Sequence, residues 1–164
     1  MALDSVVGVD IHDAATADLD ARTLYEILAL RSAVFVVEQD CVYLDADGRD
    51  LEPDARQLWI ERDGSVVATL RLLRDPDGCA RIGRVATAGP ARRGGLAEAL
   101  MRRALELAPS GDVVLGAQSY LEPWYARFGF VRDGEDYLDD GIPHLPMRLR
   151  RPLPSGRLRH DEAN

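Results

Sequence analysis

The chain has 164 residues, of which 46% are hydrophobic and 29% are charged, and its formal net charge is −8. This length and composition predict one globular domain that buries its own core. The acidic balance argues against a nucleic-acid-binding protein, whose surface would be basic, and no apolar run reaches the roughly 18 residues of a membrane span.

The N-terminal stretch and the cysteines predict a cytoplasmic protein. MALDSVVGVDIHDAATADLD lacks the basic and long apolar regions of a signal peptide. Cys41 and Cys79 lack the spacing of metal ligands. We therefore expect them to be buried small residues in a reducing compartment, with no metal site.

The first periodic pattern along the chain is helical. Asp18 or Asp20 can cap this helix, because aspartate oxygens accept hydrogen bonds from free N–H groups in a first turn. The acid-rich segment DCVYLDADGRDLEPDA then predicts a long loop. The residues that carry the helical spacing are Leu24, Ile27, Leu28, Arg31, Val34 and Phe35.

Three strands are predicted next. QLWIERD and SVVATLRLLRD flank Asp63-Gly64, a dipeptide typical of tight β-hairpin turns. A second turn, DPDG at 75–78, leads into ARIGRVATA. The three segments are therefore expected to be consecutive antiparallel strands.

The second half of the chain alternates helix and strand. A helix follows Gly95, with Pro109 and Gly111 beyond its end, and DVVLGAQ is an apolar run typical of a buried strand. LEPWYARF predicts a short helix that ends at Gly129, and FVRD and HLPMRLR predict final strands. This order predicts an α/β domain over residues 1–151 whose helices pack on a central sheet, followed by a flexible tail at 152–164. The helix that follows Gly95 has an apolar face made of Leu96, Leu100, Met101, Ala104, Leu105 and Ala108.

The stretch RVATAGPARRGGLAEALMRRAL, residues 84–105, places arginines and glycines at the start of a helix. Glycine is a poor helix former and neighbouring arginines repel each other, so local stability does not explain the arrangement. A strand, a glycine-rich turn and a helix N-terminus together present free backbone N–H groups to an anion. No G-x-G-x-x-G or G-x-x-x-x-G-K-[ST] pattern is present. A plain helix start with a glycine turn remains the alternative.

Arg92-x-x-Gly95-x-Ala97 resembles the Q/R-x-x-G-x-G/A acyl-CoA motif of the GNAT N-acetyltransferase superfamily. The resemblance implies an α/β (α+β) fold with a single mixed, mostly antiparallel sheet flanked by helices. It also implies that Val85 and Thr87 lie along the pantetheine arm of acetyl-CoA. The residues that it assigns to the pyrophosphate are Arg92, Arg93, Gly94, Gly95, Leu96 and Ala97.

A second match lies downstream in AQSYLEPWYARFGF. In the superfamily, a tyrosine four residues before Gly-Phe lies beside the thioester sulfur, and this position is Tyr125 here. Gln118 stands where many relatives carry a coenzyme-contacting asparagine. The resemblance therefore implies that Tyr125 is catalytic and that Gln118 contacts the coenzyme.

Two further segments resemble the ElaA group of this superfamily: LYEILALRSAVFVVEQDCVYLDADGRD and EDYLDDGIPHLPMRLR. VFVVEQ is also similar to acyl-homoserine-lactone synthases, which share the fold. Where the group resemblance predicts a histidine before the first hairpin strand, this chain has Gln57. This difference predicts altered acceptor selectivity.

The expected reaction moves an acetyl group to a primary amine. Tyr125 is the candidate acid for the departing thiolate, and a backbone N–H near Val85 to Thr87 would polarise the carbonyl. Direct attack is favoured over an acyl-enzyme, because neither cysteine lies in a motif with an activating histidine. Glu38 is the first candidate base and His144 the second.

The acceptor is expected to be a cationic small-molecule or peptide amine. Asp45 and Asp47 follow VFVVEQ, and a focused negative field would attract a cation. An EF-hand is excluded because D-x-D-G-x-D lacks the final glutamate. A non-catalytic acyl-CoA-binding domain, a lactone-synthase-like acyltransferase and a homodimer stay open. The candidate acceptor-binding residues are Gln39, Asp45, Asp47 and His144; further acids nearby are Asp50, Glu135, Asp136, Asp139 and Asp140.

Overall fold

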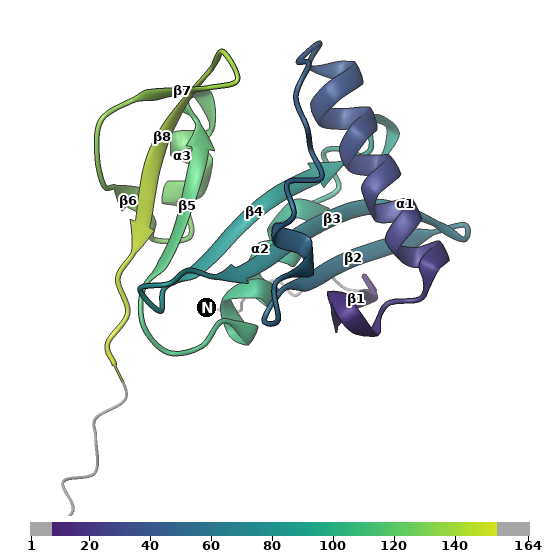
Figure 1. Cartoon of the computed structure of the whole chain (residues 1–164), viewed down its shortest axis with the longest axis horizontal. Coiled ribbons are helices and arrows are strands. Elements are labelled where there is room, and N and C mark those ends of the chain that lie inside the picture. Colours follow the sequence, from purple (N-terminus) through teal and green to yellow (C-terminus); the bar gives the residue numbers. More distant parts are fainter. Residues whose placement is uncertain (1–7, 154–164) are drawn as a thin grey trace, which may run out of the picture.

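A computed structural model describes residues 8–153 and contains an eight-stranded mixed sheet (Figure 1). The strand order is β1-β2-β3-β4-β5-β8-β6, with β7 pairing β8, and the one parallel pair is β4 with β5. This confirms the predicted α/β fold with a mostly antiparallel sheet. The strands are β1 (Ile11–Ala15), β2 (Arg56–Arg62), β3 (Ser65–Arg74), β4 (Ala80–Thr87), β5 (Val113–Gln118), β6 (Val131–Arg132), β7 (Tyr137–Asp139) and β8 (Ile142–Leu149).

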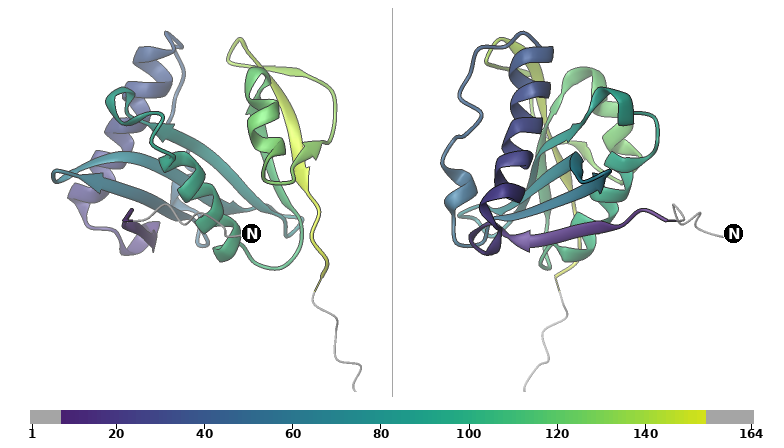
Figure 2. Two further views of the ribbon diagram at one scale, coloured as in Figure 1. Left: turned by 180° about the vertical axis from the view of Figure 1, so that it is seen from behind. Right: turned by 90° about the vertical axis from the view of Figure 1, so that its right-hand side faces the viewer.

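Helices cover both faces of the sheet (Figure 2). Helix α1 (Ala21–Arg31) packs against one face, while α2 (Leu96–Leu107) packs against the other, and α3 (Glu122–Ala126) joins the core on the α2 side. Alternation along β2 explains the two cores, because Leu58 and Ile60 face α2 whereas Trp59 faces α1. Within residues 8–153, no helix combines the length and apolar character needed to cross a membrane.

Helix α1 begins where the sequence predicted. The side chain of Asp20 accepts a hydrogen bond from the N–H of Thr23 at 2.9 Å, so Asp20 is the N-cap. After Arg31 the helix continues as a π-helix, Ser32–Glu38, which the helical periodicity did not predict. A π-helical segment widens the backbone turn and is frequent at functional sites. It brings Glu38 and Gln39 to a groove beside β4.

Both predicted turns are present. Asp63 and Gly64 have φ angles of 51° and 76°, the left-handed conformation that a two-residue hairpin turn requires. The turn at 75–78 closes with a hydrogen bond from the N–H of Gly78 to the carbonyl of Asp75 at 2.9 Å. Strands β1 and β7 were not predicted, because IHDAA is poor in β-branched residues and β7 has three exposed residues.

Strands β4 and β5 separate soon after they begin. Among the described residues they pair at two positions, Ala80 with Val113 and Arg81 with Val114. A β-bulge in β4 follows, because two residues of β4, Arg84 and Val85, stand opposite one residue of β3. Arg84 has a φ of 53°, a rare conformation for a non-glycine residue. The bulge and the separation open the centre of the sheet.

The acidic loop after the π-helix is held by arginines. Three arginines and three aspartates alternate in a closed ring of ion pairs, in the order Arg31, Asp45, Arg84, Asp47, Arg71 and Asp50. Arg31 is fully buried, and its Nη1 donates to Oδ1 of Asp50 at 2.7 Å. Gln57 is also fully buried and donates to the same oxygen at 2.9 Å. Gln57 thus supports the ring and does not line either cavity described below.

The ring should make folding stability depend on acid pH. Burial alone would raise the pKa of Asp50, but the hydrogen bonds and charges of Arg31 and Arg71 outweigh it and lower this pKa. A carboxyl with a lowered folded-state pKa stabilises the protein above its unfolded-state pKa of about 3.9, and this contribution is lost as the pH falls through the folded-state value. The free energy of unfolding should therefore decrease as the pH is lowered below about 4.

Asp50→Asn should lower the free energy of unfolding at pH 7 by about 2 kcal/mol, because Arg31 and Arg71 lose a buried charged partner while one oxygen acceptor remains. Urea titrations at pH 7 and pH 3 would measure the change. The variant should also lose less stability than wild type between these pH values. Asp10→Asn is the matched control, since the Asp10 side chain is 93% exposed. Equal stability of the Asp50 and Asp10 variants would contradict a stabilising ring.

Candidate functional site

The loop before α2 has the backbone geometry of an anion site. Arg93 and Gly95 have left-handed φ angles of 66° and 73°, and no side chain caps the start of α2. The first-turn N–H groups of a helix have no intrahelical partner, and the helix dipole adds positive potential there. This geometry and the charge of Arg93 fit a pyrophosphate group.

Arg92 makes a different set of contacts. Its guanidinium pairs with both carboxylate oxygens of Glu38, and its Nε donates to the carbonyl of Thr87 at 3.0 Å. The hydrogen bond from Arg92 lowers the pKa of Glu38. A carboxylate that is already paired and stabilised in its ionised form is a weak proton acceptor. This pairing argues against Glu38 as the base, and it neutralises the charge that Arg92 would offer a phosphate.

A groove of about 670 Å³ runs from this loop to the open centre of the sheet. Such a volume suits a drug-sized or cofactor-sized ligand. Gly94 belongs to the same loop but is not among the lining residues. The groove brings together most of the predicted coenzyme residues: Val85, Thr87, Arg92, Arg93, Gly95, Leu96, Ala97 and Gln118.

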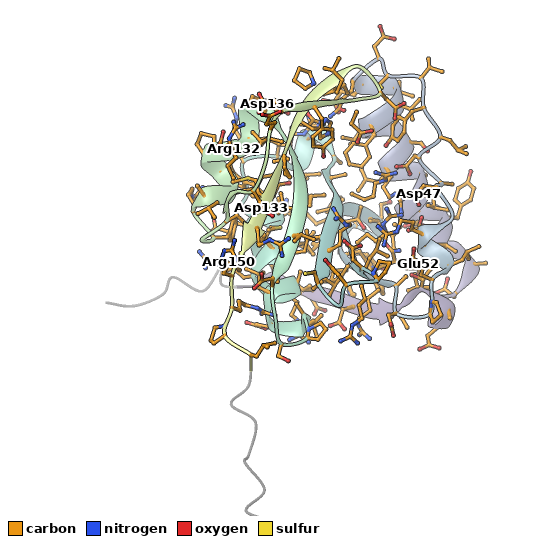
Figure 3. All side chains as sticks on the ribbon, turned by 60° about the vertical axis from the view of Figure 1, so that its left-hand side comes forward. Asp47, Glu52, Arg132, Asp133, Asp136 and Arg150 are labelled. Atoms are coloured by element: carbon orange, nitrogen blue, oxygen red, sulfur yellow. The ribbon has the colours of Figure 1, made fainter. Side chains whose placement is uncertain are left out.

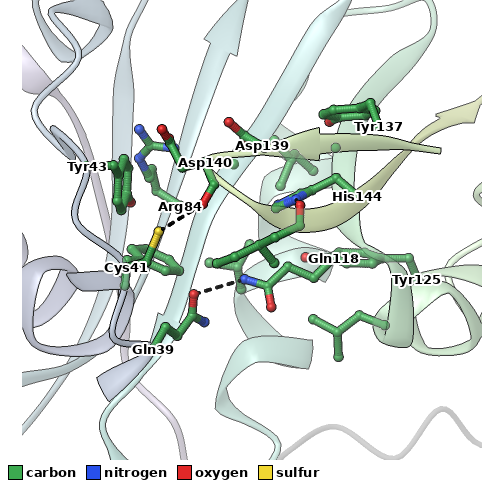
Figure 4. A pocket seen from close by; sticks show the side chains of 17 residues that line it. Gln39, Cys41, Tyr43, Arg84, Gln118, Tyr125, Tyr137, Asp139, Asp140 and His144 are labelled. Carbon is green, nitrogen blue, oxygen red and sulfur yellow. Dashed lines mark hydrogen bonds between the residues drawn. The ribbon is translucent and has the colours of Figure 1, made fainter. Parts of the chain in front are cut away.

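A second cavity, of about 160 Å³, lies between β4 and β5 under the β7–β8 hairpin (Figure 4). His144 and Gln39, two predicted acceptor residues, line it. A cavity of this size admits a small chemical group. The two cavities are continuous, because six residues line both of them: Phe35, Gln39, Val85, Gln118, Leu121 and Tyr125.

Tyr125 lies at this junction. It is 7% exposed and packs edge-on against the rings of Trp124 and Phe130. Burial raises the pKa of Tyr125 to about 12. The phenol therefore keeps its proton at neutral pH and can donate a hydrogen bond to a group at the junction.

His144 lies beside Gln118 and opposite Tyr137. In the β5–β8 ladder it is the direct partner of Gln118, and its ring stacks on Tyr137 with centroids 5.7 Å apart. Its Nδ1 lies 2.8 Å from the carbonyl oxygen of Ile142. A carbonyl accepts only from N–H, so Nδ1 carries the hydrogen of the neutral ring and Nε2 carries a lone pair. Among the described residues no partner takes Nε2, so His144 can act as a proton acceptor.

The structure changes which acidic residues could give the negative field that the sequence predicted on the acceptor side. Asp45 and Asp47 do not line the small cavity, and both pair with arginines of the ring, which argues against their predicted role in acceptor binding. Asp136 likewise pairs with Arg132 (Figure 3). The loop acids follow the π-helix in sequence, but their side chains turn toward buried arginines. Two acids do line the cavity, Asp139 and Asp140, and both are exposed.

Several lining residues were not predicted. Arg84 reaches the cavity from the β4 bulge, and its guanidinium lies 5.5 Å from the ring centroid of Tyr43. The thiol of Cys41 donates to the carbonyl of Asp140 at 3.4 Å and so joins the loop to the β7–β8 turn. Gly116 was the one sequence signal for this part of the cavity, because a glycine inside a strand marks a place where another group comes close to the backbone. A Cβ there would overlap the hydroxyl of Tyr137.

Comparison with known proteins agrees with this geometry. Residues 33–151 match the family model described as an acetyltransferase (GNAT) domain. A UPF0039 protein of Mycobacterium tuberculosis is 50% identical over 134 residues, which cover 79% of this chain and 86% of the relative. Protein ElaA of Escherichia coli is 39% identical over 145 residues, covering 85% of this chain and 95% of ElaA.

A solved structure is also similar. The crystal structure of an acyl-CoA N-acyltransferase from Pseudomonas aeruginosa is 45% identical and superposes with a TM-score of 0.80. The alignment covers 85% of this chain and 98% of that protein. The fold of this chain therefore has a counterpart of similar sequence.

Proposed function

This chain belongs to the GNAT acetyltransferase family, in the ElaA-like group, and from that premise we propose that it transfers an acetyl group from acetyl-CoA to a small primary amine. The observation that carries the proposal is the junction of the two cavities at Tyr125. One cavity is lined by the loop before α2, whose backbone geometry suits an anion, and the other is lined by the carboxylates of Asp139 and Asp140. A coenzyme thioester and an amine can therefore meet beside Tyr125.

The chain's own groups would hold the acetyl donor at both ends. The N–H groups of the loop and α2, with Arg93, would bind the pyrophosphate. The β4 backbone near Val85 and Thr87 lines the groove beside the separation from β5 and would bind the amides of the pantetheine arm. Arg92 would position the loop through Glu38 and Thr87.

Three groups would serve the chemistry. His144 Nε2 would take a proton from the amine, directly or through one water, as the new C–N bond forms. An N–H of β4 near Val85 would stabilise the negative charge that develops on the carbonyl oxygen. Tyr125 would protonate the sulfur as the C–S bond breaks. Since each step has a group at the junction, direct attack needs no acyl-enzyme.

The acceptor is proposed to be cationic in solution. The carboxylates of Asp139 and Asp140 line the cavity, and among the described residues no ion pair neutralises them. A negative rim raises the local concentration of protonated amines. A protonated amine must lose a proton before its nitrogen can attack the thioester. Small aliphatic amines are therefore the first acceptors to test.

Thiol release from acetyl-CoA across a panel of primary amines, with mass spectrometry of the acetylated product, tests this function. Turnover with at least one amine is expected. A thermal shift with acetyl-CoA but no thiol release with any amine would favour a non-catalytic acyl-CoA-binding domain instead. No shift and no release would contradict both functions.

The same assay separates the two candidate bases. His144→Ala should lower kcat by about 30-fold, because it removes the lone pair beside the amine, and added imidazole should restore part of the rate. Glu38→Gln should lower kcat by no more than about threefold, because Glu38 is already paired with Arg92. The reverse order of effects would assign the base to Glu38.

A further inference from the structure

Two glutamine side chains bridge the two walls of the site (Figure 4). Gln39 follows the π-helix on the α1 side, and Gln118 ends β5 on the other side of the opening. The Nε2 of Gln118 donates to the Oε1 of Gln39 at 3.2 Å. Both residues line both cavities, so this hydrogen bond lies at the junction where the amine must meet the thioester.

The bridge fixes which way the Gln118 amide points. Because its NH₂ group faces Gln39, its Oε1 faces away, and among the described residues this oxygen has no hydrogen-bond partner. His144 is the direct cross-strand partner of Gln118, and its Nε2 lone pair also lacks a partner in the described part of the chain. Side chains of directly opposed residues begin about 5 Å apart. Two hydrogen-bond acceptors without a described partner therefore belong to neighbouring residues, Gln118 and His144, that both line the small cavity.

We propose that Gln118 Oε1 and His144 Nε2 together orient the acceptor amine, and that Gln39 is the positioning residue that holds Gln118 in the accepting orientation. This inference rests on the proposed acetyl transfer. A neutral primary amine has two N–H donors and one lone pair. If the two acceptors take both N–H groups, the lone pair is left to face the acetyl carbon.

The arrangement accounts for every atom of the step. The amine nitrogen forms a bond to the acetyl carbon, and the C–S bond breaks with its electron pair going to sulfur. His144 takes one N–H proton, and Tyr125 gives a proton to the sulfur. The remaining N–H of the product amide stays hydrogen-bonded to Gln118 Oε1. A secondary amine has one N–H and cannot satisfy both acceptors, so the site should prefer primary amines.

Without Gln39 the Gln118 amide could rotate. Its NH₂ group would then face the amine and could bond only to the amine's lone pair, which is the electron pair that must attack the acetyl carbon. Gln39 itself needs only an acceptor oxygen for this role. A glutamate at position 39 should therefore replace it, whereas a leucine of similar size should not. If Gln39 instead served the carbonyl oxygen through its own NH₂ group, glutamate would fail as well.

The test compares Gln39→Leu with Gln39→Glu. For a primary amine, Gln39→Leu should lower kcat/KM by about 10-fold, the cost of one oriented hydrogen bond. It should also reduce the preference for a primary amine over its N-methyl analogue. Gln39→Glu should stay within about threefold of wild type in both quantities. The thermal midpoint should change little in either variant, because Gln39 is partly exposed.

Two outcomes would overturn the inference. The first is a Gln39→Leu variant that equals wild type in kcat/KM and amine preference, and the second is a Gln39→Glu variant that is as impaired as Gln39→Leu. Either result in an active wild-type background leaves the proposed function standing. A wild-type protein that acetylates no amine would instead overturn the proposed function, and this inference with it.

Discussion

Gly95→Glu should lower the affinity for acetyl-CoA by at least about 1000-fold, the largest effect that we expect for a single substitution. Gly95 lies at the N-cap of α2, where the N–H groups of the loop and helix converge. A carboxylate there would repel a pyrophosphate and compete with it for the same donors. Isothermal titration calorimetry with acetyl-CoA would measure the loss.

Gly95→Ala is the matched control. Both variants place a side chain on a residue with a φ of 73°, which strains the backbone by about 1–2 kcal/mol without unfolding a typical domain. The alanine variant should therefore share the lowered thermal midpoint but keep acetyl-CoA affinity within about 10-fold of wild type. If the glutamate variant bound acetyl-CoA as well as the alanine variant, the loop would not be the pyrophosphate site.

Tyr125→Phe should lower kcat by at least about 100-fold while changing acetyl-CoA affinity by less than about threefold. Phenylalanine keeps the buried ring and its edge-on packing against Trp124, but it removes the proton donor at the junction. Steady-state thiol release and calorimetry on the same preparation would separate turnover from binding. Tyr25→Phe on α1 is the control, because Tyr25 is 74% exposed and lines neither cavity.

The pH profile gives a second check on Tyr125. Burial raises the pKa of its phenol to about 12, so the group stays protonated across the usual assay range. The wild-type kcat should therefore show no decrease from loss of this proton below about pH 10. A Tyr125→Phe variant with wild-type turnover would remove Tyr125 from the chemistry.

Much of the fold could be predicted from the sequence where a local pattern has one main physical cause. Asp63-Gly64 allows the left-handed pair that a tight hairpin needs, and Asp20 supplies the oxygen that caps α1. The glycine-rich start of α2 lacks any benefit for helix stability, which made a ligand-binding role the better explanation. The GNAT family resemblance added the positions of Tyr125 and Gln118, which the structure brings to one junction.

Other features depend on contacts between distant segments. A run of aspartates does not show whether it faces solvent or buried arginines, so the ion pairs of Asp45 and Asp47 with Arg31 and Arg71 could not be predicted. Arg31 is 14 residues from Asp45 and 19 from Asp50, and its burial becomes visible only when the ring forms. The left-handed conformation of Arg84 and the π-helix also have no single-residue signal.

The pairing of Glu38 with Arg92 shows the same limit at the proposed active site. The two residues are 54 positions apart, and each alone suggested a role, one as a base and the other as a phosphate ligand. Together they form a link between the end of the π-helix and the coenzyme loop. His144 is left as the base that the geometry favours, because its Nε2 has no partner in the described chain.

A crystal structure with bound coenzyme A tests the central claim most directly, namely that the donor and acceptor sites meet at Tyr125. The pyrophosphate should lie on the N–H groups of residues 93–97. The coenzyme sulfur should lie within about 3.5 Å of the Tyr125 hydroxyl, with the small cavity lined by His144 still open beside it. A pyrophosphate bound away from this loop, or a sulfur that does not reach the junction, would show that the two sites do not meet at Tyr125.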